Sequence, residues 1–531
     1  MSNEVQPRKG YVTSFFYMEE VHVMDNQTIV ILDFGGQYKE LIARRVRECG
    51  VYSVILPYDT AVDELKKIKP IGLIFTGGPN SVYLADSPQC DRGVFSLGVP
   101  ILGICYGMQL ICHMLGGTVS PCESSEYGRI GLTVDAKNPL FGEIPEMTNV
   151  LMSHTDKVTA LPDGFLSLAH TADCAVAAFA AKDKNIYGVQ FHPEVEISEH
   201  GTELIRNFLY AICKAKGDYS MEDYLAKQID SVRRQVGNEH VILGLSGGVD
   251  SSVCAALLSA AIPGQLTCIY IDHGFMRKNE TAEIEKAFAG RDLDFVRVDA
   301  SERFLARIRG VTDPEEKRKR VGDEFVRVFQ DEAKKHSHAK FLAQGTIYPD
   351  VVESGKNKSA VIKSHHNVGG LPEDLGFIGV VEPLRGLFKD EVRHLGRMLG
   401  LPKKLVERQP FPGPGLSIRV IGEVTREKLD ILREADAIFR EELQKSRAKA
   451  DQFFAVLTNT RSVGVMGDFR TYDYTLALRA VQTNDFMTCE FAHLPYALLA
   501  RASARITNEV KGINRVVYDV TSKPPATIEW E

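Results

Sequence analysis

The sequence lacks the features that define several large classes of protein. Its ten cysteines include no CxxC pair and no zinc-like Cys/His spacing, which argues against a disulfide framework and favours a reducing, cytoplasmic compartment. No apolar run is long enough to span a membrane. Lysine and arginine (63) do not outnumber aspartate and glutamate (70), so nothing indicates a nucleic-acid-binding surface. We therefore expect a soluble protein with no nucleic-acid partner and no membrane partner.

The chain is too long for a single hydrophobic core. Its 531 residues predict several domains, because cores stop growing at a few hundred residues. Residues 1–27 carry charges on both sides of a short apolar stretch and lack the small residues of a cleavage site, so this segment is not a secretory signal. We expect it to be a flexible N-terminal extension.

Apolar runs alternate with helical stretches from residue 28 to residue 217. Thr28–Phe34, Val51–Leu56 and Ile71–Phe75 read as buried strands, and a helix is expected over about 37–49. This strand–helix order predicts a parallel sheet covered on both faces, which is the doubly wound α/β class.

A cysteine stands where one of these strands turns into a helix. Gly103 and Gly107 flank Cys105 at the spacing of a nucleophile elbow, where small neighbours permit the strained turn that exposes the reactive side chain. The sulfur there faces a helix N-terminus, which favours the thiolate. A buried cysteine is more often a small apolar residue, so this interpretation needs a base elsewhere in the chain.

The segment from Gly188 to Glu194 supplies such a base. An apolar strand ends at His192, and Glu194 can reach back to fix the imidazole tautomer. Backbone amides at Gly78 and Tyr106 could form an oxyanion hole. These motifs resemble the class I glutamine amidotransferases over residues 28–217. The resemblance implies that Cys105, His192 and Glu194 form a catalytic triad that releases ammonia from glutamine.

A second strand–turn–helix carries a loop suited to phosphate. After the buried strand Val241–Leu245, two glycines, three serine hydroxyls and a carboxylate converge at a helix N-terminus. The loop residues are Ser246, Gly247, Gly248, Val249, Asp250, Ser251 and Ser252. The loop has no lysine and does not fit the P-loop pattern. It resembles the pyrophosphate-binding loop of the ATP pyrophosphatases, which implies ATP as co-substrate and Mg²⁺ held by Asp250; an ordinary turn with capping serines is the structural alternative.

Residues 218–409 continue the α/β pattern as a second doubly wound domain. The end of the strand Leu266–Asp272 is the expected site of adenine and ribose. The charge run over 314–320 reads for the most part as a solvated helix face. Asp350, Glu353 and Lys363, in a glycine-rich stretch, suit a lid over a polyphosphate.

Four further segments resemble the glutamine-hydrolysing GMP synthetases over nearly the whole chain from Thr28 onward. They are QGTIYPDVVES, SHHNVGGLPE, RQPFPGPG and the tail KPPATIEWE. The resemblance implies that residues 410–531 form a smaller α+β domain that pairs in a homodimer and binds xanthosine monophosphate (XMP). The candidate XMP contacts, carried over by matching motif, are Arg318, Arg419, Gln452, Lys523, Ile528 and Glu529.

The resemblance implies a two-step amination. Glutamine yields ammonia, ATP adenylates XMP, and ammonia then displaces AMP to give GMP. Two other interpretations are open at this point. Another pyrophosphate-loop enzyme, such as NAD synthetase or a tRNA thiolase, would lack the KPPATIEWE tail, and a non-catalytic binding module would be expected to have lost a triad or loop residue.

Overall fold

The computed structural model describes residues 26–354, 376–483 and 488–531. The predicted N-terminal extension therefore lies almost wholly outside the described residues. The chain forms two compact units, Met1–Tyr224 and Leu225–Glu531. The three domain boundaries expected from the sequence, after residues 27, 217 and 409, remain predictions, since the second unit contains both the expected pyrophosphatase segment and the expected C-terminal segment.

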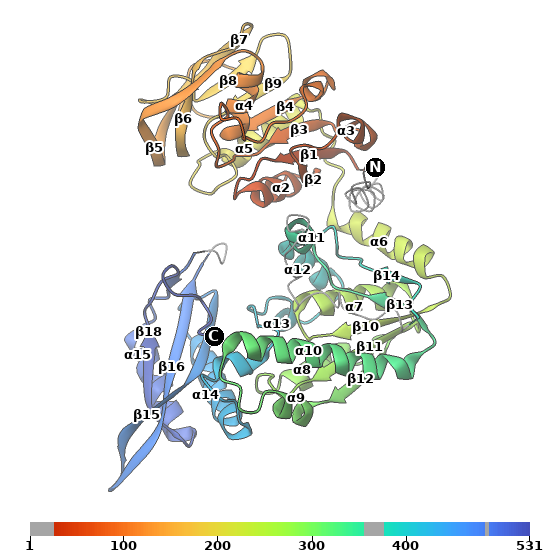
Figure 1. The fold of residues 1–531 in the computed structure, drawn as a ribbon, viewed down its shortest axis with the longest axis vertical. Helices are drawn as coiled ribbons and strands as arrows, with labels where there is room; N and C mark the ends of the chain where they lie inside the picture. Colours follow the sequence, from red (N-terminus) through yellow and green to blue (C-terminus); the bar gives the residue numbers. More distant parts are fainter. Residues whose placement is uncertain (1–25, 355–375, 484–487) are drawn as a thin grey trace, which may run out of the picture. The chain divides into compact units, whose positions relative to one another are not determined.

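The first unit is built on a nine-stranded sheet in the order β2-β1-β3-β4-β9-β8-β7-β5-β6 (Figure 1). The five strands from β2 to β9 in this order are parallel, and their apolar runs are buried. They are β2 (Tyr52–Pro57), β1 (Thr28–Asp33), β3 (Gly72–Phe75), β4 (Ile101–Ile104) and β9 (Ile186–Val189). The helices are α2 (Lys39–Glu48), α3 (Val62–Ile68), η1 (Arg92–Ser96), α4 (Tyr106–Met114), α5 (Gly201–Asn207) and η2 (Phe208–Ile212).

Four antiparallel strands extend this sheet on one side. They are β5 (Thr118–Val134), β6 (Met147–Ala160), β7 (Phe165–His170) and β8 (Ala178–Ala181). The sequence did not predict this extension. Pro121 and a register shift before Glu126 interrupt β5, so its apolar residues do not keep a period of two.

The second unit begins with helix α6 (Met221–Val236), whose first residues precede the unit's boundary, and a five-stranded parallel sheet in the order β12-β11-β10-β13-β14. The strands are β12 (Asp294–Asp299), β11 (Leu266–Asp272), β10 (His240–Leu245), β13 (Ala339–Ala343) and β14 (Gly379–Val381). The helices are α7 (Val249–Ala261), α8 (Glu280–Phe288), α9 (Ser301–Arg307), α10 (Pro314–Ala333), η3 (Lys334–His336), α11 (Tyr348–Ser354), α12 (Lys389–Met398) and α13 (Lys403–Val406).

The last part of this unit is α+β. A four-stranded sheet holds β15 (Gln452–Met466), β16 (Phe469–Gln482), β17 (Glu490–Phe491) and β18 (Ile513–Asp519), with η5 (Gly415–Arg419), α14 (Arg426–Gln444) and α15 (Tyr496–Glu509) beside it. The β15–β16 hairpin projects past helices α14 and α15 (Figure 1). One buried core runs from β10 and β11 through η5 to α14, β15 and β16. Together with the parallel sheets, this confirms the predicted α/β class.

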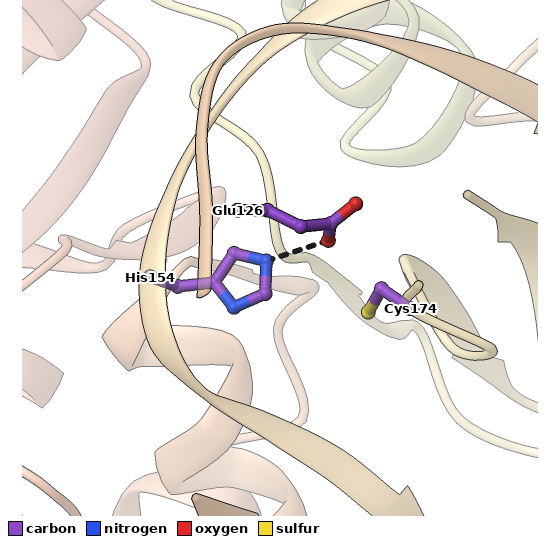
Figure 2. Close-up of side chains that lie close together, drawn as sticks. All are labelled: Glu126, His154 and Cys174. Carbon is purple, nitrogen blue, oxygen red and sulfur yellow. Dashed lines mark hydrogen bonds and ion pairs between the residues drawn. The ribbon is translucent and has the colours of Figure 1, made fainter. Parts of the chain in front are cut away.

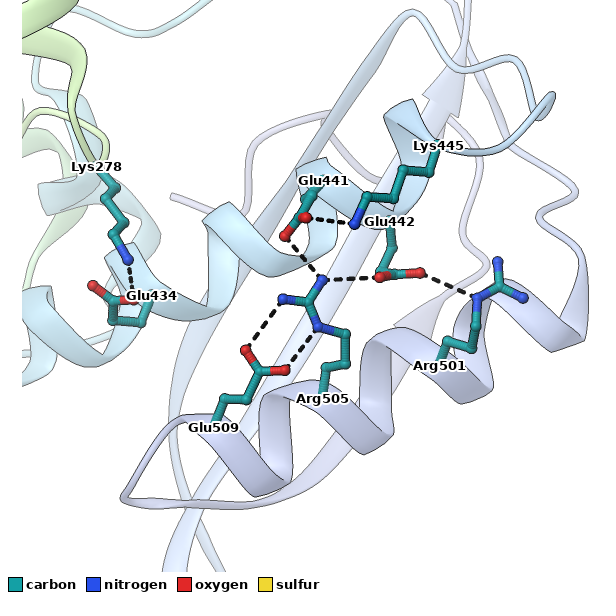
Figure 3. A network of polar contacts seen from close by, with 8 residues as sticks. All are labelled: Lys278, Glu434, Glu441, Glu442, Lys445, Arg501, Arg505 and Glu509. Atoms are coloured by element: carbon teal, nitrogen blue, oxygen red, sulfur yellow. Dashed lines mark hydrogen bonds and ion pairs between the residues drawn. The ribbon is translucent and has the colours of Figure 1, made fainter.

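A charged network joins α14 to α15 on the surface. Arg505 contacts Glu441 and Glu442 of α14 at 2.9 Å and Glu509 of its own helix at 2.7 Å (Figure 3). These carboxylates raise the pKa of Arg505 through hydrogen bonds. Glu442 is buried, but the other members are partly or largely exposed, so the network contributes only modestly to stability.

The charge run predicted as a solvated face is only partly one. Asp313 caps helix α10 by accepting from Glu316 N at 2.8 Å, and Arg320 pairs with Glu316. Lys317, however, is wholly buried. Among the described residues, no helix is both long and apolar enough to cross a lipid bilayer.

Candidate active sites

Cys105 lies at the turn between β4 and α4, as the sequence predicts. Its φ of +52° is unusual for a residue other than glycine, and such strain persists only where the surroundings fix it. Gly103 and Gly107 fix it here: a Cβ on Gly103 would lie 2.6 Å from the Gly107 carbonyl carbon, and one on Gly107 would lie 2.5 Å from the Phe75 carbonyl oxygen. Strand and helix can meet this closely only without side chains at these two positions.

His192 and Glu194 lie on the loop that follows β9. Glu194 Oε1 is 2.7 Å from His192 Nδ1, and both side chains are buried. The contact leaves Nε2 as the nitrogen available for other partners. A Cβ placed on Gly77 would lie 3.2 Å from His192 Cε1 and 3.8 Å from Cys105 Cβ, so the imidazole and the thiol-bearing residue border the same small space.

The protonation of His192 depends on its two neighbours. Burial lowers the pKa of His192, but the Glu194 carboxylate and hydrogen bonds to Cys105 and Glu194 outweigh it, and the pKa ends well above its ordinary value. An imidazolium next to a sulfur is the arrangement that stabilises a thiolate. The geometry therefore suits nucleophilic attack by Cys105.

The two residues predicted for an oxyanion hole lie against each other. A Cβ on Gly78 would lie 3.1 Å from the Tyr106 ring and 2.8 Å from the Phe34 carbonyl oxygen. Tyr106 is the first residue of α4, so its amide is one of those left without an intrahelical acceptor. Its hydroxyl donates to the Pro88 carbonyl at 2.6 Å, which fixes the ring.

The phosphate loop lies between β10 and α7. Gly247 has a φ of +73°, and a Cβ there would lie 2.4 Å from Ile284. Ser246 Oγ accepts from Gly248 N at 3.2 Å and contacts Ser251 Oγ at 3.0 Å. These contacts hold the loop in the shape that leaves the first amides of α7 without helical partners.

Two cations that the sequence did not single out hold this loop. Lys389 Nζ, at the start of α12, lies 2.6 Å from both carboxylate oxygens of Asp250. Arg408 donates to the Gly247 carbonyl and pairs with Glu280. Burial lowers the pKa of Arg408 to about 10, which still leaves it charged at neutral pH. Each cation is thus paired with a carboxylate at the loop, Lys389 with Asp250 and Arg408 with Glu280.

The Asp250 carboxylate fits the Mg²⁺ role predicted for it. Mg²⁺ is commonly held by one or two carboxylates together with substrate phosphates and water. Asp250 is half-buried at the N-terminus of α7, and its partner Lys389 shows that the carboxylate faces a position suited to a cation. The Ser252 hydroxyl, fully buried beside it, has no hydrogen-bond partner among the described residues.

Most of the predicted XMP contacts meet around the C-terminal tail. Arg419 makes a two-pronged ion pair with Glu529, at 3.0 Å and 2.7 Å, and Gln452 Nε2 donates to the same carboxylate at 3.0 Å. Arg318 donates to the backbone oxygen of Glu531. Ile528 packs in a small buried cluster with Phe454 and Val456.

Two buried guanidinium groups in this region keep unused donors. Arg419 Nη1 and Arg277 Nη2 have no hydrogen-bond partner in the described part of the chain. Phe411 lies beneath both, with its ring centre 5.3 Å from Arg419 and 4.2 Å from Arg277. Burial lowers the pKa of Arg277, as does the charge of Arg419. Buried donors of this kind usually have a partner, which suits a bound anion or nucleotide.

Three segments of the chain match known protein families. Residues 30–212 match the family "Glutamine amidotransferase class-I", residues 221–317 match "NAD synthase", and residues 441–530 match "GMP synthase C terminal domain". The chain is 58% identical over 510 residues to a glutamine-hydrolyzing GMP synthase of Finegoldia magna, covering 96% of this chain and 100% of that protein. A Treponema denticola protein of the same name is 59% identical over 507 residues, covering 95% of this chain and 97% of that one.

The chain belongs to the glutamine-hydrolysing GMP synthases. The match of residues 221–317 to NAD synthase reflects the shared pyrophosphatase segment, whereas the similarity to whole GMP synthases runs through the tail. The family is one of glutamine-hydrolysing ligases, so the chain is an enzyme of this class.

The predicted lid residues of this GMP synthase are only partly described. Asp350 lies in α11, and its Oδ2 accepts from Ile347 N at 3.2 Å, so the carboxylate is engaged at the start of its own helix. The backbone of Glu353 belongs to the same helix. Lys363 lies outside the described residues. The lid remains a prediction.

Lys523 is half-buried in the tail, and its backbone pairs with Cys489 at 3.0 Å and 2.9 Å. This pairing fixes the tail's path beside β17. The expected role of the Lys523 ammonium toward a phosphate remains a prediction.

A buried group in the amidotransferase unit has ligand atoms close enough for a metal. Glu126, His154 and Cys174 offer atoms within 4.8 Å of one another (Figure 2). Burial raises the pKa of Cys174 to about 12, and Glu126 adds to this, so the thiol is neutral. His154 Nε2 lies 3.0 Å from Glu126 Oε2, and Thr171 donates to Glu126 Oε1 at 2.7 Å. Both carboxylate oxygens of Glu126 are therefore already hydrogen-bonded. The remaining ligand atoms are nitrogen and sulfur, which Mg²⁺ does not prefer.

Proposed function

We propose that this chain makes GMP from XMP, ATP and glutamine, with glutamate, AMP and diphosphate as the other products. The observation that carries the proposal is the similarity to whole glutamine-hydrolyzing GMP synthases at 58% identity over 96% of the chain. The two candidate sites supply the two halves of such a reaction.

In the first half, Cys105 attacks the side-chain amide of glutamine. His192, held by Glu194, takes the thiol proton and returns it to the departing ammonia, and water then hydrolyses the glutamyl thioester. The amides at Gly78 and Tyr106 would bind the oxygen that becomes negative. The raised pKa of His192 supports this assignment, because it provides the proton for the leaving group.

In the second half, the loop from Ser246 to Ser252 binds the pyrophosphate part of ATP. Asp250 would hold Mg²⁺, which neutralises phosphate charge when bound. The O2 oxygen of XMP attacks the α-phosphorus, pyrophosphate leaves, and ammonia later displaces AMP from the purine carbon. Adenylation is needed because the unmodified oxygen is a poor leaving group. Asp350, Glu353 and Lys363 are the proposed lid contacts.

XMP would lie beside the tail and contact Arg419, Gln452, Ile528 and Glu529. Arg318 and Lys523 are the other two proposed contacts. The unused donors of Arg419 and Arg277 support this placement, because an oxygen of the substrate would satisfy them. Such donors also give selectivity, since a ligand without the matching oxygen leaves them unpaired.

The protein would act as a homodimer in the cytoplasm. Exposed apolar side chains on the β15–β16 hairpin support the dimer: Val465 is 74% exposed, Phe469 78% and Tyr472 63%. Apolar side chains gathered on a projecting hairpin are typical of an interface. The absence of disulfides among the described cysteines suits a reducing compartment.

One assay tests the whole proposal. The purified chain is given XMP, ATP and Mg²⁺ with either glutamine or ammonium, and GMP, AMP and pyrophosphate are measured. We expect equal amounts of the three products with both nitrogen donors. Release of phosphate and ADP in place of pyrophosphate and AMP would contradict the proposal.

A further inference from the structure

The sulfur of Cys105 has two polar neighbours besides His192. Gln190 Nε2 lies 3.6 Å from Sγ, and the Ser153 carbonyl oxygen lies 3.8 Å from it. The two neighbours act in opposite directions. A carbonyl accepts only, so it favours the neutral thiol, whereas an amide N–H donates and therefore favours the thiolate. The orientation of the Gln190 amide decides whether this donor faces the sulfur.

A chain of hydrogen bonds fixes that orientation. Gln109 Nε2 donates to the Asp156 carbonyl at 2.8 Å and to Gln190 Oε1 at 3.1 Å. Because a carbonyl cannot donate, Gln109 must turn its NH₂ group toward Asp156. The second hydrogen of that group then requires the oxygen of Gln190, which leaves the NH₂ group of Gln190 facing Cys105. Turning either amide over would place like groups against each other in a buried site.

The Asp156 carbonyl can serve as this anchor because of where it lies in the sheet. Asp156 pairs in register with Pro121 of β5, and proline has no N–H to offer a sheet partner. The carbonyl also contacts His154 Nδ1 at 3.0 Å, and His154 is tied to Glu126 on its other side (Figure 2). The anchor is therefore held from two directions.

Burial makes the contact at the sulfur effective. Gln190 is completely buried, and Gln109 is 3% exposed. Water cannot replace either amide, and electrostatic effects are stronger where water is absent. His192, held by Glu194 behind it, is a charged group that interacts with the sulfur in this buried site.

We propose that Gln190 is a further catalytic residue of glutamine hydrolysis, whose amide N–H stabilises the Cys105 thiolate, and that Gln109 is its positioning residue. The inference rests on the proposed function of the triad. When the thiol proton passes to His192, the sulfur gains a negative charge and the Gln190 amide donates to it without giving up its own proton. The same amide continues to donate when the thioester is hydrolysed and the thiolate returns.

The test uses alkylation of Cys105 in the full-length chain without substrate. Iodoacetamide labelling is followed by peptide mass spectrometry as a function of pH for the wild type, Gln190→Met and Gln109→Met. Methionine has a similar length but no donor. We expect the pH midpoint of Cys105 labelling to rise by about one unit in Gln190→Met, which means roughly tenfold slower labelling at neutral pH. Gln109→Met, which frees the amide to rotate, should give a smaller rise.

Cys49 serves as the internal reference because it lies in the same unit and is partly exposed. Its labelling should be the same in all three proteins. An unchanged midpoint for Cys105 in Gln190→Met, with Cys49 unaffected, would overturn the inference. Labelling of the buried Cys112 in Gln190→Met would mean that the unit has opened. In that case Gln109→Met is the deciding variant, and an unchanged pH midpoint of Cys105 labelling in Gln109→Met would also overturn the inference. A wild type that does not hydrolyse glutamine would instead contradict the proposed function.

Discussion

Arg419 and Glu529 form a partly buried ion pair across 110 residues of sequence, with two hydrogen bonds of 2.7 Å and 3.0 Å. The Arg419 side chain is wholly buried, and its guanidinium lies 3.9 Å from the centre of the Phe454 ring. The pair ties the end of the chain to η5. It also brings a carboxylate, an amide from Gln452 and an unused guanidinium donor to one place.

Removing one partner of this pair should be costly. In Glu529→Gln the charge of Arg419 is left buried without its counter-ion, so the free energy of unfolding of the second unit should fall by about 3–5 kcal/mol. The XMP concentration at half-maximal rate should rise as well. Urea denaturation followed by circular dichroism, together with steady-state kinetics, checks both.

Glu434→Gln is the matched control for Glu529→Gln. Glu434 pairs with Lys278 at 2.5 Å on the surface, and both side chains are nearly half exposed (Figure 3). Its loss should cost less than about 1 kcal/mol. Equal losses of unfolding free energy in the two variants would show that the Arg419–Glu529 pair contributes no more to stability than a surface pair.

Cys105→Ala separates the two nitrogen donors. We expect GMP formation from glutamine to vanish and formation from ammonium to remain, because the substitution removes the nucleophile alone. Cys112→Ala, about two turns further along α4 and also buried, is the matched control and should keep both activities. A Cys105 variant that still uses glutamine would mean that the triad is wrongly assigned.

Asp250→Asn should remove GMP formation with either donor. The substitution takes away the proposed Mg²⁺ ligand and the partner of Lys389, so the rate should fall on the order of 100-fold or more. Pyrophosphate release from ATP and XMP is the measurement. Asp230→Asn, in an exposed pair with Arg233 on α6, should leave the rate unchanged.

The second unit should lose stability in mild acid through His273. Complete burial lowers the pKa of His273 to about 4, against about 6.5 in the unfolded chain. The unfolded state alone takes up the proton between these values, so stability is full above pH 6.5 and falls as the pH drops toward 4. At about 1.4 kcal/mol per pH unit, the loss between pH 6.5 and pH 5 is roughly 2 kcal/mol.

His273→Asn should reduce this pH dependence. An asparagine oxygen can replace His273 Nδ1 as the acceptor for Phe275 N, a contact of 3.0 Å. Trp530, the single tryptophan of the chain, reports on unfolding of this unit by fluorescence in urea. His338→Asn, at an exposed position, should leave the pH dependence as it is in the wild type. An equal acid sensitivity in His273→Asn would contradict the assignment.

The apolar hairpin predicts how the dimer can be separated. Phe469→Lys places a charge at an apolar contact, so the mass measured by light scattering should fall by half. Met147→Lys is the control, since Met147 is 77% exposed in the first unit, a similar degree to the 78% of Phe469. A wild type that is already a monomer would remove the dimer from the proposal.

The sequence predicted those parts of the fold that are set by local pattern. Continuous apolar runs such as Leu266–Asp272 matched a strand residue for residue, and the helix expected over about 37–49 matched α2, Lys39–Glu48. The spacing of Cys105 between two glycines predicted the sharp turn at this residue, because such a turn, like a strand or a helix, depends on neighbours within a few residues.

The parts that were missed depend on contacts between distant segments. Lys389 meets Asp250 across 139 residues, and no local pattern distinguishes it from a surface lysine. Lys317 lies in a run of charges, yet it is buried because the carbonyl of Val420 and the carboxylate of Glu531 accept its hydrogen bonds. A signal for such residues exists only once the fold brings their partners together.

The pairing of Lys389 with Asp250 has a consequence for the order in which the second site fills. While the ammonium occupies both carboxylate oxygens, a free divalent ion has to compete with a tethered cation that is always present at high local concentration. A polyphosphate gives the ammonium another anion to contact and so releases the carboxylate. Nucleotide and Mg²⁺ should therefore enter cooperatively, and the apo-protein should take up little of the ion alone.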